Sequence, residues 1–234
     1  VIDIKSNEKA FVGLYHNGNI VCWGDSATGG TTPPDVSNVL QLYSNKNAFS
    51  VLQSDGSIKS WGLLTGTTPD IKNVIDIYST NSSFAALDAS GNVYCWGSGD
   101  TTQNTPPTDL SNVAMIYSND DAFAALISDG TVMCWGDAEN GGTTPTDISN
   151  IDYISNTNTA FTAVTNDGKI ISWGNSVNGG TFINEIYHED SPVQTILVTA
   201  DLSGIFKFAG FDDCSGNLEF INNDTNGNAG IVNN

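Results

Sequence analysis

Short apolar runs separated by polar turns alternate along most of the chain. In residues 123–136, an apolar run that starts at Phe123 is followed by Ser128-Asp129-Gly130 and then by a second run that ends at Trp135-Gly136. Asp-Gly between two short apolar runs is the strongest local signal for a β-hairpin, and a type I′ turn requires positive φ at both central residues. The pattern therefore predicts a hairpin with a type I′ turn.

This hairpin pattern occurs five times with constant internal spacing. In each copy Gly follows Phe by 7 residues and Trp follows that Gly by 5, and successive tryptophans are 38, 35, 39 and 38 residues apart. A repeat of this length indicates a solenoid, a propeller or another array, in which a unit buries its apolar face only against its neighbours. The repeated positions are Phe11, Phe49, Phe84, Phe123 and Phe161, then Gly18, Gly56, Gly91, Gly130 and Gly168, then Trp23, Trp61, Trp96, Trp135 and Trp173.

Another apolar segment precedes each hairpin, for example residues 39–43, 74–78 and 113–117. The pattern thus predicts three strands per repeat and leaves open a fourth strand in the connector that follows Trp-Gly. The connectors are rich in Gly, Thr and Pro, and Pro is excluded from central strands. We therefore expect the connectors at the outer rim or on one face.

The pattern weakens after Trp173. A degenerate sixth unit is recognisable in residues 181–210, where Gly204 is followed five residues later by Ala209-Gly210 in place of Trp-Gly. Residues 211–234 are expected to form a partial blade or an Asn/Gly-rich tail. The chain opens with Val1-Ile2-Asp3-Ile4, which matches the start of a repeat and has no initiating Met, so we expect a portion of a longer polypeptide.

A short strand, a small turn, an Asp-Gly hairpin and a terminal Trp-Gly resemble the repeat of the regulator of chromosome condensation family. The resemblance covers residues 1–180 clearly and 181–210 faintly. It implies an all-β protein, a β-propeller with blades of about 38 residues, six or seven in number with the last ones degenerate. Family members include exchange factors for a small GTPase, ligase-associated modules and inhibitors, so the fold does not fix the activity.

The chain is strongly acidic, with 26 acidic and 7 basic residues and a formal charge of −19. This charge would repel a phosphate backbone, so nucleic acid is not expected as a partner. No apolar run is long enough to span a membrane, so membrane insertion is not expected. Only 14% of the residues are charged, which is below the usual quarter. The composition favours a surface or extracellular protein over a cytosolic enzyme.

Three of the four cysteines, Cys22, Cys95 and Cys134, directly precede Trp, where the other repeats have Ser60 and Ser172. A position shared by Cys and Ser requires a small side chain. Equivalent positions in successive repeats are expected to lie too far apart for a disulfide, so these thiols are expected to be reduced packing residues. The fourth cysteine, Cys214, lies outside the pattern and is open to pairing with another chain.

Tyrosines recur near the end of the first strand of the repeats, and a row of them would suit stacking on a sugar or docking of a partner. The alternative is that they pack between blades with their hydroxyls at the edge. Lys5 and Ile154 are expected to take this position in the first and fifth repeats, which would interrupt the row. The tyrosines concerned are Tyr43, Tyr78, Tyr117 and Tyr187.

Other polar positions carry weaker signals. Asn222, Asp224 and Asn226 match the early ligands of a calcium loop, but Asn233 stands where a bidentate Glu is required. His188, near Glu185, Glu189 and Asp190, is a weak metal candidate. Asp55, Asp129 and Asp167 recur in the hairpin turn, where turn geometry explains them. No cofactor is expected and no metal site is assigned.

No nucleophile-base pair or phosphate-binding motif stands out, and a catalytic residue should break the repeat because chemistry needs one site. The leading expectation is a non-catalytic module of a larger secreted or surface assembly, which binds a protein partner or self-assembles through loops on one face. One alternative is a sugar-active enzyme or lectin-like carbohydrate binder that uses Glu185, Glu189 and Asp190. A protein inhibitor or GTPase regulator is the third possibility.

Overall fold

The computed structural model describes residues 1–181 and three short segments beyond them, 197–198, 219–222 and 229–232. Within residues 3–174 the chain forms five antiparallel sheets of three strands, and consecutive strands pair in each. The first strands are β1 (Asp3–Ser6), β4 (Val39–Ser44), β7 (Val74–Ser79), β10 (Val113–Ser118) and β13 (Ile151–Asn156). The second strands are β2 (Ala10–Leu14), β5 (Ala48–Gln53), β8 (Ser83–Asp88), β11 (Ala122–Ile127) and β14 (Ala160–Thr165). The third strands are β3 (Ile20–Gly24), β6 (Ile58–Gly62), β9 (Val93–Gly97), β12 (Val132–Gly136) and β15 (Ile170–Gly174).

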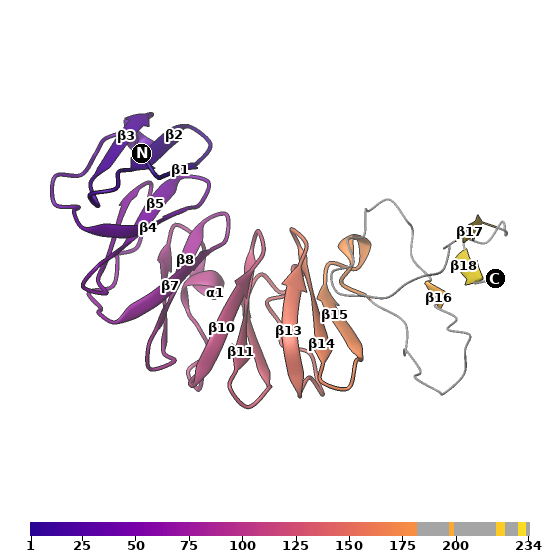
Figure 1. Cartoon of the computed structure of the whole chain (residues 1–234). Coiled ribbons are helices and arrows are strands. Elements are labelled where there is room, and N and C mark those ends of the chain that lie inside the picture. The colour runs from indigo at the N-terminus through magenta and orange to yellow at the C-terminus, as the bar shows by residue number, and fades with distance from the viewer. Residues whose placement is uncertain (182–196, 199–218, 223–228, 233–234) are drawn as a thin grey trace.

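The five sheets follow one another along an open arc in chain order (Figure 1). The first strand is an edge strand of its sheet, and the first strands of consecutive sheets contact each other, β1 with β4, β4 with β7, β7 with β10 and β10 with β13. The prediction of an all-β propeller-type fold built from repeated three-stranded blades is confirmed. Among these five sheets the connectors add no fourth strand.

The hairpins occur where the sequence predicts them, but the predicted turn type is wrong. Gly130 has φ of 83°, whereas Asp129 is not among the residues with positive φ. The Gly130 amide donates to the Ile127 carbonyl, and the Ile127 amide donates to the Thr131 carbonyl. This is the three-residue loop that combines a type I turn with a glycine bulge. Asp is favoured before the Gly because its carboxylate accepts from the Thr131 amide two residues on.

The core lies between sheets. The face that each sheet turns to the sheet before it, called here the leading face, carries two aliphatic residues of the first strand, the Phe of the second and the Trp of the third. In the fourth sheet the leading face is Val113, Ile116, Phe123 and Trp135, and it packs on Ala85 and Leu87 of the third sheet. Phe and Trp of one sheet are cross-strand neighbours, with ring centroids 5.1–5.7 Å apart in all five sheets.

The Cys/Ser position faces the tryptophan of the next sheet. In the second sheet, Ser60 Oγ accepts from Trp96 Nε1 of the third sheet at 3.0 Å. Burial raises the pKa of the Cys95 thiol to about 12, an effect reduced by the neighbouring Trp135 indole. Cys22, Cys95 and Cys134 are free, as the sequence predicts for small packing residues.

Backbone hydrogen bonds join consecutive sheets at both ends of their strands. At one end, the amide of the first residue of β4, β7, β10 and β13 donates to the carbonyl of the turn glycine in the preceding sheet. These bonds, 2.9–3.1 Å long, run from Val39 to Gly18, Val74 to Gly56, Val113 to Gly91 and Ile151 to Gly130. At the other end, an amide in each turn between first and second strands donates to a carbonyl in the corresponding turn of the next sheet. These bonds run from Glu8 to Lys46, Lys46 to Asn81, Asn81 to Asp120 and Asp120 to Asn158. These bonds fix the angle between neighbouring sheets.

Short helical turns begin three of the connectors, η1 (Ser26–Thr28), α1 (Thr101–Asn104) and η2 (Ser176–Asn178). Their N-caps are Asp25, Asp100 and Asn175, whose side chains accept hydrogen bonds from backbone amides of the helical turn. Beyond residue 181, β16 (Leu197–Val198), β17 (Glu219–Asn222) and β18 (Ala229–Val232) form a sheet in the order β16-β18-β17. This order differs from the consecutive pairing of the first five sheets. No helix in the part of the chain that the structure describes is long and apolar enough to cross a membrane.

Candidate functional site along the first-strand edge

The recurring tyrosines of β4, β7 and β10 occupy equivalent register positions. Tyr43 pairs with Ser50, Tyr78 with Ala85 and Tyr117 with Ala124 on the adjacent second strands. All three side chains are half-buried and pack against the core of the junction with the next sheet. This is the interblade packing that the sequence leaves as the alternative to an exposed aromatic row.

The end positions of this row need one correction. Lys5 pairs with Val12 and takes the tyrosine position in the first sheet, as expected. In the fifth sheet the register pairs Ser155 with Thr162, so Ser155 and not Ile154 takes the tyrosine position. Ile154 is buried and corresponds to Ile116, one residue before the tyrosine. Tyr187 lies outside the described residues.

Asp76 of β7 connects two of the tyrosines. The Tyr43 hydroxyl donates to Asp76 Oδ1 at 2.7 Å, and the Ile77 amide donates to the same oxygen at 2.8 Å. Burial, followed by the hydrogen bond to Asp76, raises the pKa of Tyr43. Burial and the negative charge of Asp76 raise the pKa of Tyr78 to about 12. Both phenols are therefore neutral hydroxyl groups beside a carboxylate at neutral pH.

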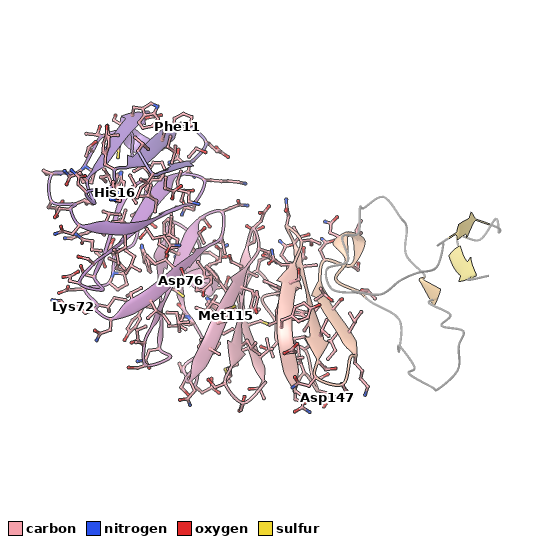
Figure 2. All side chains as sticks on the ribbon, viewed as in Figure 1. Phe11, His16, Lys72, Asp76, Met115 and Asp147 are labelled. Carbon is pink, nitrogen blue, oxygen red and sulfur yellow. The ribbon has the colours of Figure 1, made fainter. Side chains whose placement is uncertain are left out.

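A shallow hollow of about 340 Å³ opens at these residues, between β1, β4 and β7. Its polar lining includes Lys5, Gln41, Tyr43, Asp76, Tyr78 and Ser79. Figure 2 shows Asp76 and Met115 on the adjacent strands β7 and β10, both on the side of the arc turned to the viewer. This polar depression is open to solvent at the edge of the arc, so it can accept a side chain of a partner.

Exposed apolar side chains lie along the first strands of the first five sheets, and nothing in the sequence pattern distinguishes them from buried strand residues. Each lies at the second or third position of a first strand or of its lead-in, and their exposed fractions range from 45% to 62%. In β4 and β7 a β-bulge accounts for them, because Leu40 and Ile75 are the extra residues where the register shifts. The residues, called here the edge stripe, are Ile2, Leu40, Ile75, Met115 and Tyr153.

The remaining sequence candidates fall into two groups. Asp55 and Asp129 accept amides inside the hairpin turns, as expected from turn geometry. His16 is exposed in the first hairpin turn, where the Gly18 amide donates to the Tyr15 carbonyl. Asn222 is the last residue of β17, and nothing is described for its side chain. The other weak metal and acidic candidates, Asp224, Asn226, Glu185, His188, Glu189 and Asp190, lie outside the described residues, as does Cys214. Within the described part, no three His, Cys, Asp or Glu side chains are grouped to hold a metal ion.

No protein-family model matches the chain, and no curated protein matches it. Solved structures do match. Yeast RCC1 (Prp20) bound to Kap60 aligns with a TM-score of 0.52 and 18% identity over 74% of this chain and 55% of that one. Human WBSCR16 aligns with a TM-score of 0.52 and 16% identity over 73% of this chain and 61% of that one. Prp20p from Saccharomyces cerevisiae aligns with a TM-score of 0.51 and 17% identity over 73% of this chain and 56% of that one.

The chain thus spans between 55% and 61% of the length of these solved structures. These solved structures match about three quarters of this chain at low sequence identity, and the first five sheets of this chain are three-stranded repeats. The chain has the fold of an RCC1-like β-propeller.

Proposed function

We propose that this chain is a non-catalytic, protein-binding propeller segment whose partner docks along the first-strand edge. The edge stripe carries the proposal: it places one solvent-exposed apolar side chain in each of five consecutive sheets, on strands that contact each other. Contiguous exposed apolar surface bordered by polar groups is typical of a protein-interaction site. The docking surface is therefore made of strand residues rather than of the loops expected from the sequence.

The solved structures with this fold support binding of proteins. Yeast RCC1 (Prp20) is bound to Kap60 in one of them, and Prp20p has binding properties toward Gsp1p and histones. Those partners belong to those proteins. For this chain they support the general class, a protein partner, and GTPase regulation or inhibition is a narrower form of the same proposal.

The repeat itself argues against catalysis. The Phe, Gly and Trp positions of the first five sheets carry the same residues, whereas a reaction requires one distinct group of side chains. Carbohydrate binding at the tyrosines is less well supported than protein binding, because the rings of Tyr43, Tyr78 and Tyr117 are half-buried between sheets and are not free to stack on a sugar. A place in a surface or extracellular assembly remains a prediction from composition.

The proposal is tested by removing the edge stripe while keeping the fold. Leu40→Ser with Ile75→Ser changes two exposed stripe residues. Leu63→Ser is the control, because this leucine is also more than half exposed but lies in the connector after β6. Partners captured by wild-type protein are identified by mass spectrometry, and their affinities are then measured directly. We expect the double variant to weaken binding by about tenfold or more, and the control to bind as wild type. Equal binding by all three proteins would overturn the proposal.

The enzyme alternative has its own test. Turnover of glycoside substrates by the wild-type chain, lost on Glu185→Gln, Glu189→Gln or Asp190→Asn, would show that the chain is a catalyst. We expect no turnover by any of these proteins.

A further inference from the structure

We propose that the partner presents a basic and apolar peptide segment, which places one lysine or arginine side chain on Asp76 in the hollow and apolar side chains on the neighbouring edge stripe. This inference rests on the proposed function and identifies the chemistry of the partner. It requires that Asp76 be a charged, accessible acceptor held in a fixed position. The geometry of the hollow meets these requirements.

Asp76 is held in place by neutral donors. Its two short hydrogen bonds, from the Tyr43 hydroxyl and the Ile77 amide, both end on Oδ1, which leaves lone pairs of Oδ2 for a further donor. The side chain is half-buried, so its position is restrained while solvent still reaches it. Because hydroxyl and amide donors carry no charge, neither of them forms an ion pair with the carboxylate.

Within the described residues, no lysine forms an ion pair with Asp76. The three ion pairs found there are Lys59 with Asp35, Lys72 with Asp55 and Lys169 with Asp167. Lys5 lines the hollow but does not come within the 4.0 Å of Asp76 that would make an ion pair. The best partner for a positioned carboxylate without a cation is an ammonium or guanidinium group from another molecule.

The surrounding surface selects for both charge and apolar character. The five first strands carry Asp3, Asp76 and Asp152 against Lys5, and the whole chain has a charge of −19, so cationic segments are attracted to this edge. Leu40 lies next to the hollow residue Gln41 in β4, and Ile75 lies next to Asp76 in β7; both are more than half exposed. A purely cationic segment would leave these two side chains in water, whereas a segment with alternating apolar and basic residues covers them.

The experiment uses the whole chain and a labelled heptapeptide of alternating leucine and arginine. A leucine-glutamate heptapeptide, an oligolysine of equal length and spermine are the comparison probes. Asp76→Asn removes the charge but keeps an acceptor for Tyr43. Asp129→Asn is the matched control, because it removes the same charge in a hairpin turn where the first repeat has Asn17. Fluorescence anisotropy at about 150 mM salt gives the affinities, since exposed charges farther apart than about 8 Å are largely screened there.

We expect the leucine-arginine peptide to bind wild type and the Asp129→Asn protein alike, and to bind Asp76→Asn about tenfold or more weakly. The leucine-glutamate peptide, oligolysine and spermine should bind at least about tenfold more weakly than the leucine-arginine peptide. The inference is overturned by an unchanged affinity of Asp76→Asn, by oligolysine or spermine binding as well as the mixed peptide, or by no binding of the mixed peptide to wild type.

The two proposals fail separately. If the natural partner is lost on Leu40→Ser with Ile75→Ser but not on Asp76→Asn, the edge stripe binds a partner without a cation at Asp76, so this inference is wrong and the proposed function stands. If the stripe variant leaves the natural partner bound, the proposed function is wrong.

Discussion

The first sheet and the four that follow contain the same aromatic pair in different surroundings. Phe11 and Trp23 stack with centroids 5.3 Å apart, as close as the pairs in the later sheets. Yet both side chains are 44% exposed, whereas Phe49, Phe84, Phe123 and Phe161 are at most 1% exposed. The pair forms from the hairpin alone, and its burial comes from the preceding sheet.

The same contrast holds across the whole leading face. Val1 and Ile4, which correspond to Val39 and Leu42, are 63% and 54% exposed, whereas their counterparts are buried. A sheet of this kind is therefore stabilised mainly by its junctions, as in repeat proteins whose stability is a sum of unit and nearest-neighbour contributions. Changes at an inner junction should cost far more free energy than the same changes in the first sheet.

The largest effect is expected for Phe123→Ala. Phe123 is fully buried between the third and fourth sheets, so its removal leaves a cavity in the junction core and should lower the free energy of unfolding by about 3–5 kcal/mol. Phe11→Ala removes the same ring from an exposed pair and should cost less than about 1.5 kcal/mol. Urea denaturation followed by circular dichroism measures both. Equal losses would show that the hairpin, and not the junction, holds the aromatic pair.

A second, smaller effect is expected at the Cys/Ser position. Ser60→Ala removes the acceptor of the Trp96 indole, which is 2% exposed, and should cost about 1–2 kcal/mol. Cys22→Ala is the matched change at the first junction, where the Trp61 indole donates to the Gly29 carbonyl instead, so it should cost less. Ser60→Cys should lie between wild type and Ser60→Ala, because a thiol fills the space and is a weak acceptor. A loss for Cys22→Ala as large as that for Ser60→Ala would contradict the role of the indole bond.

The regular part of this architecture is readable from the sequence because it depends on contacts near in sequence. The spacing of Phe, Gly and Trp places the second and third strands and their turn in all five described repeats. The turn type was mispredicted because Asp-Gly is compatible with both the two-residue and the three-residue loop, and only the pairing of Ile127 with Thr131 distinguishes them.

The candidate site is harder to predict because it depends on contacts between repeats. The bond from Tyr43 to Asp76 joins residues 33 positions apart, and Asp76 has no acidic counterpart in the second, fourth or fifth repeat. The edge stripe depends on bulges that expose Leu40 and Ile75, which read as ordinary apolar strand residues. One feature of the sequence does mark the contacts between repeats, because an Asn directly precedes the first strand in four of them. These residues, Asn38, Asn73, Asn112 and Asn150, all have positive φ where the chain passes the hairpin turn of the preceding sheet.

Alkaline pH should weaken the inner junctions where tyrosines pack. Burial raises the pKa of Tyr78 to about 12, above its value in the unfolded chain, so its contribution to stability is fully present below about pH 10 and is lost as the pH rises toward 12. The first sheet has Lys5 in place of this tyrosine. Unfolding midpoints measured between about pH 9 and pH 11.5 should fall for wild type and fall less for Tyr78→Phe. The same slope in both proteins would show that other groups cause the loss.

The smallest effect is expected where the first sheet and the inner sheets are alike. The hairpin turn has Asn17 in the first sheet and Asp129 in the fourth, and each side chain accepts the amide two residues on. Since neither turn depends on a neighbouring sheet for this bond, Asn17→Asp and Asp129→Asn should each change Tm by no more than about 1 °C at neutral pH.

The Thr131 hydroxyl and amide lower the pKa of Asp129, so its charge stabilises the turn above the ordinary pKa of Asp, and this contribution disappears as the pH falls through the lowered value. Asp129→Asn should therefore reduce the loss of Tm in acid, and Asn17→Asp should increase it. Opposite signs or a large shift at neutral pH would mean that the turns differ between end and inner sheets as much as the junctions do.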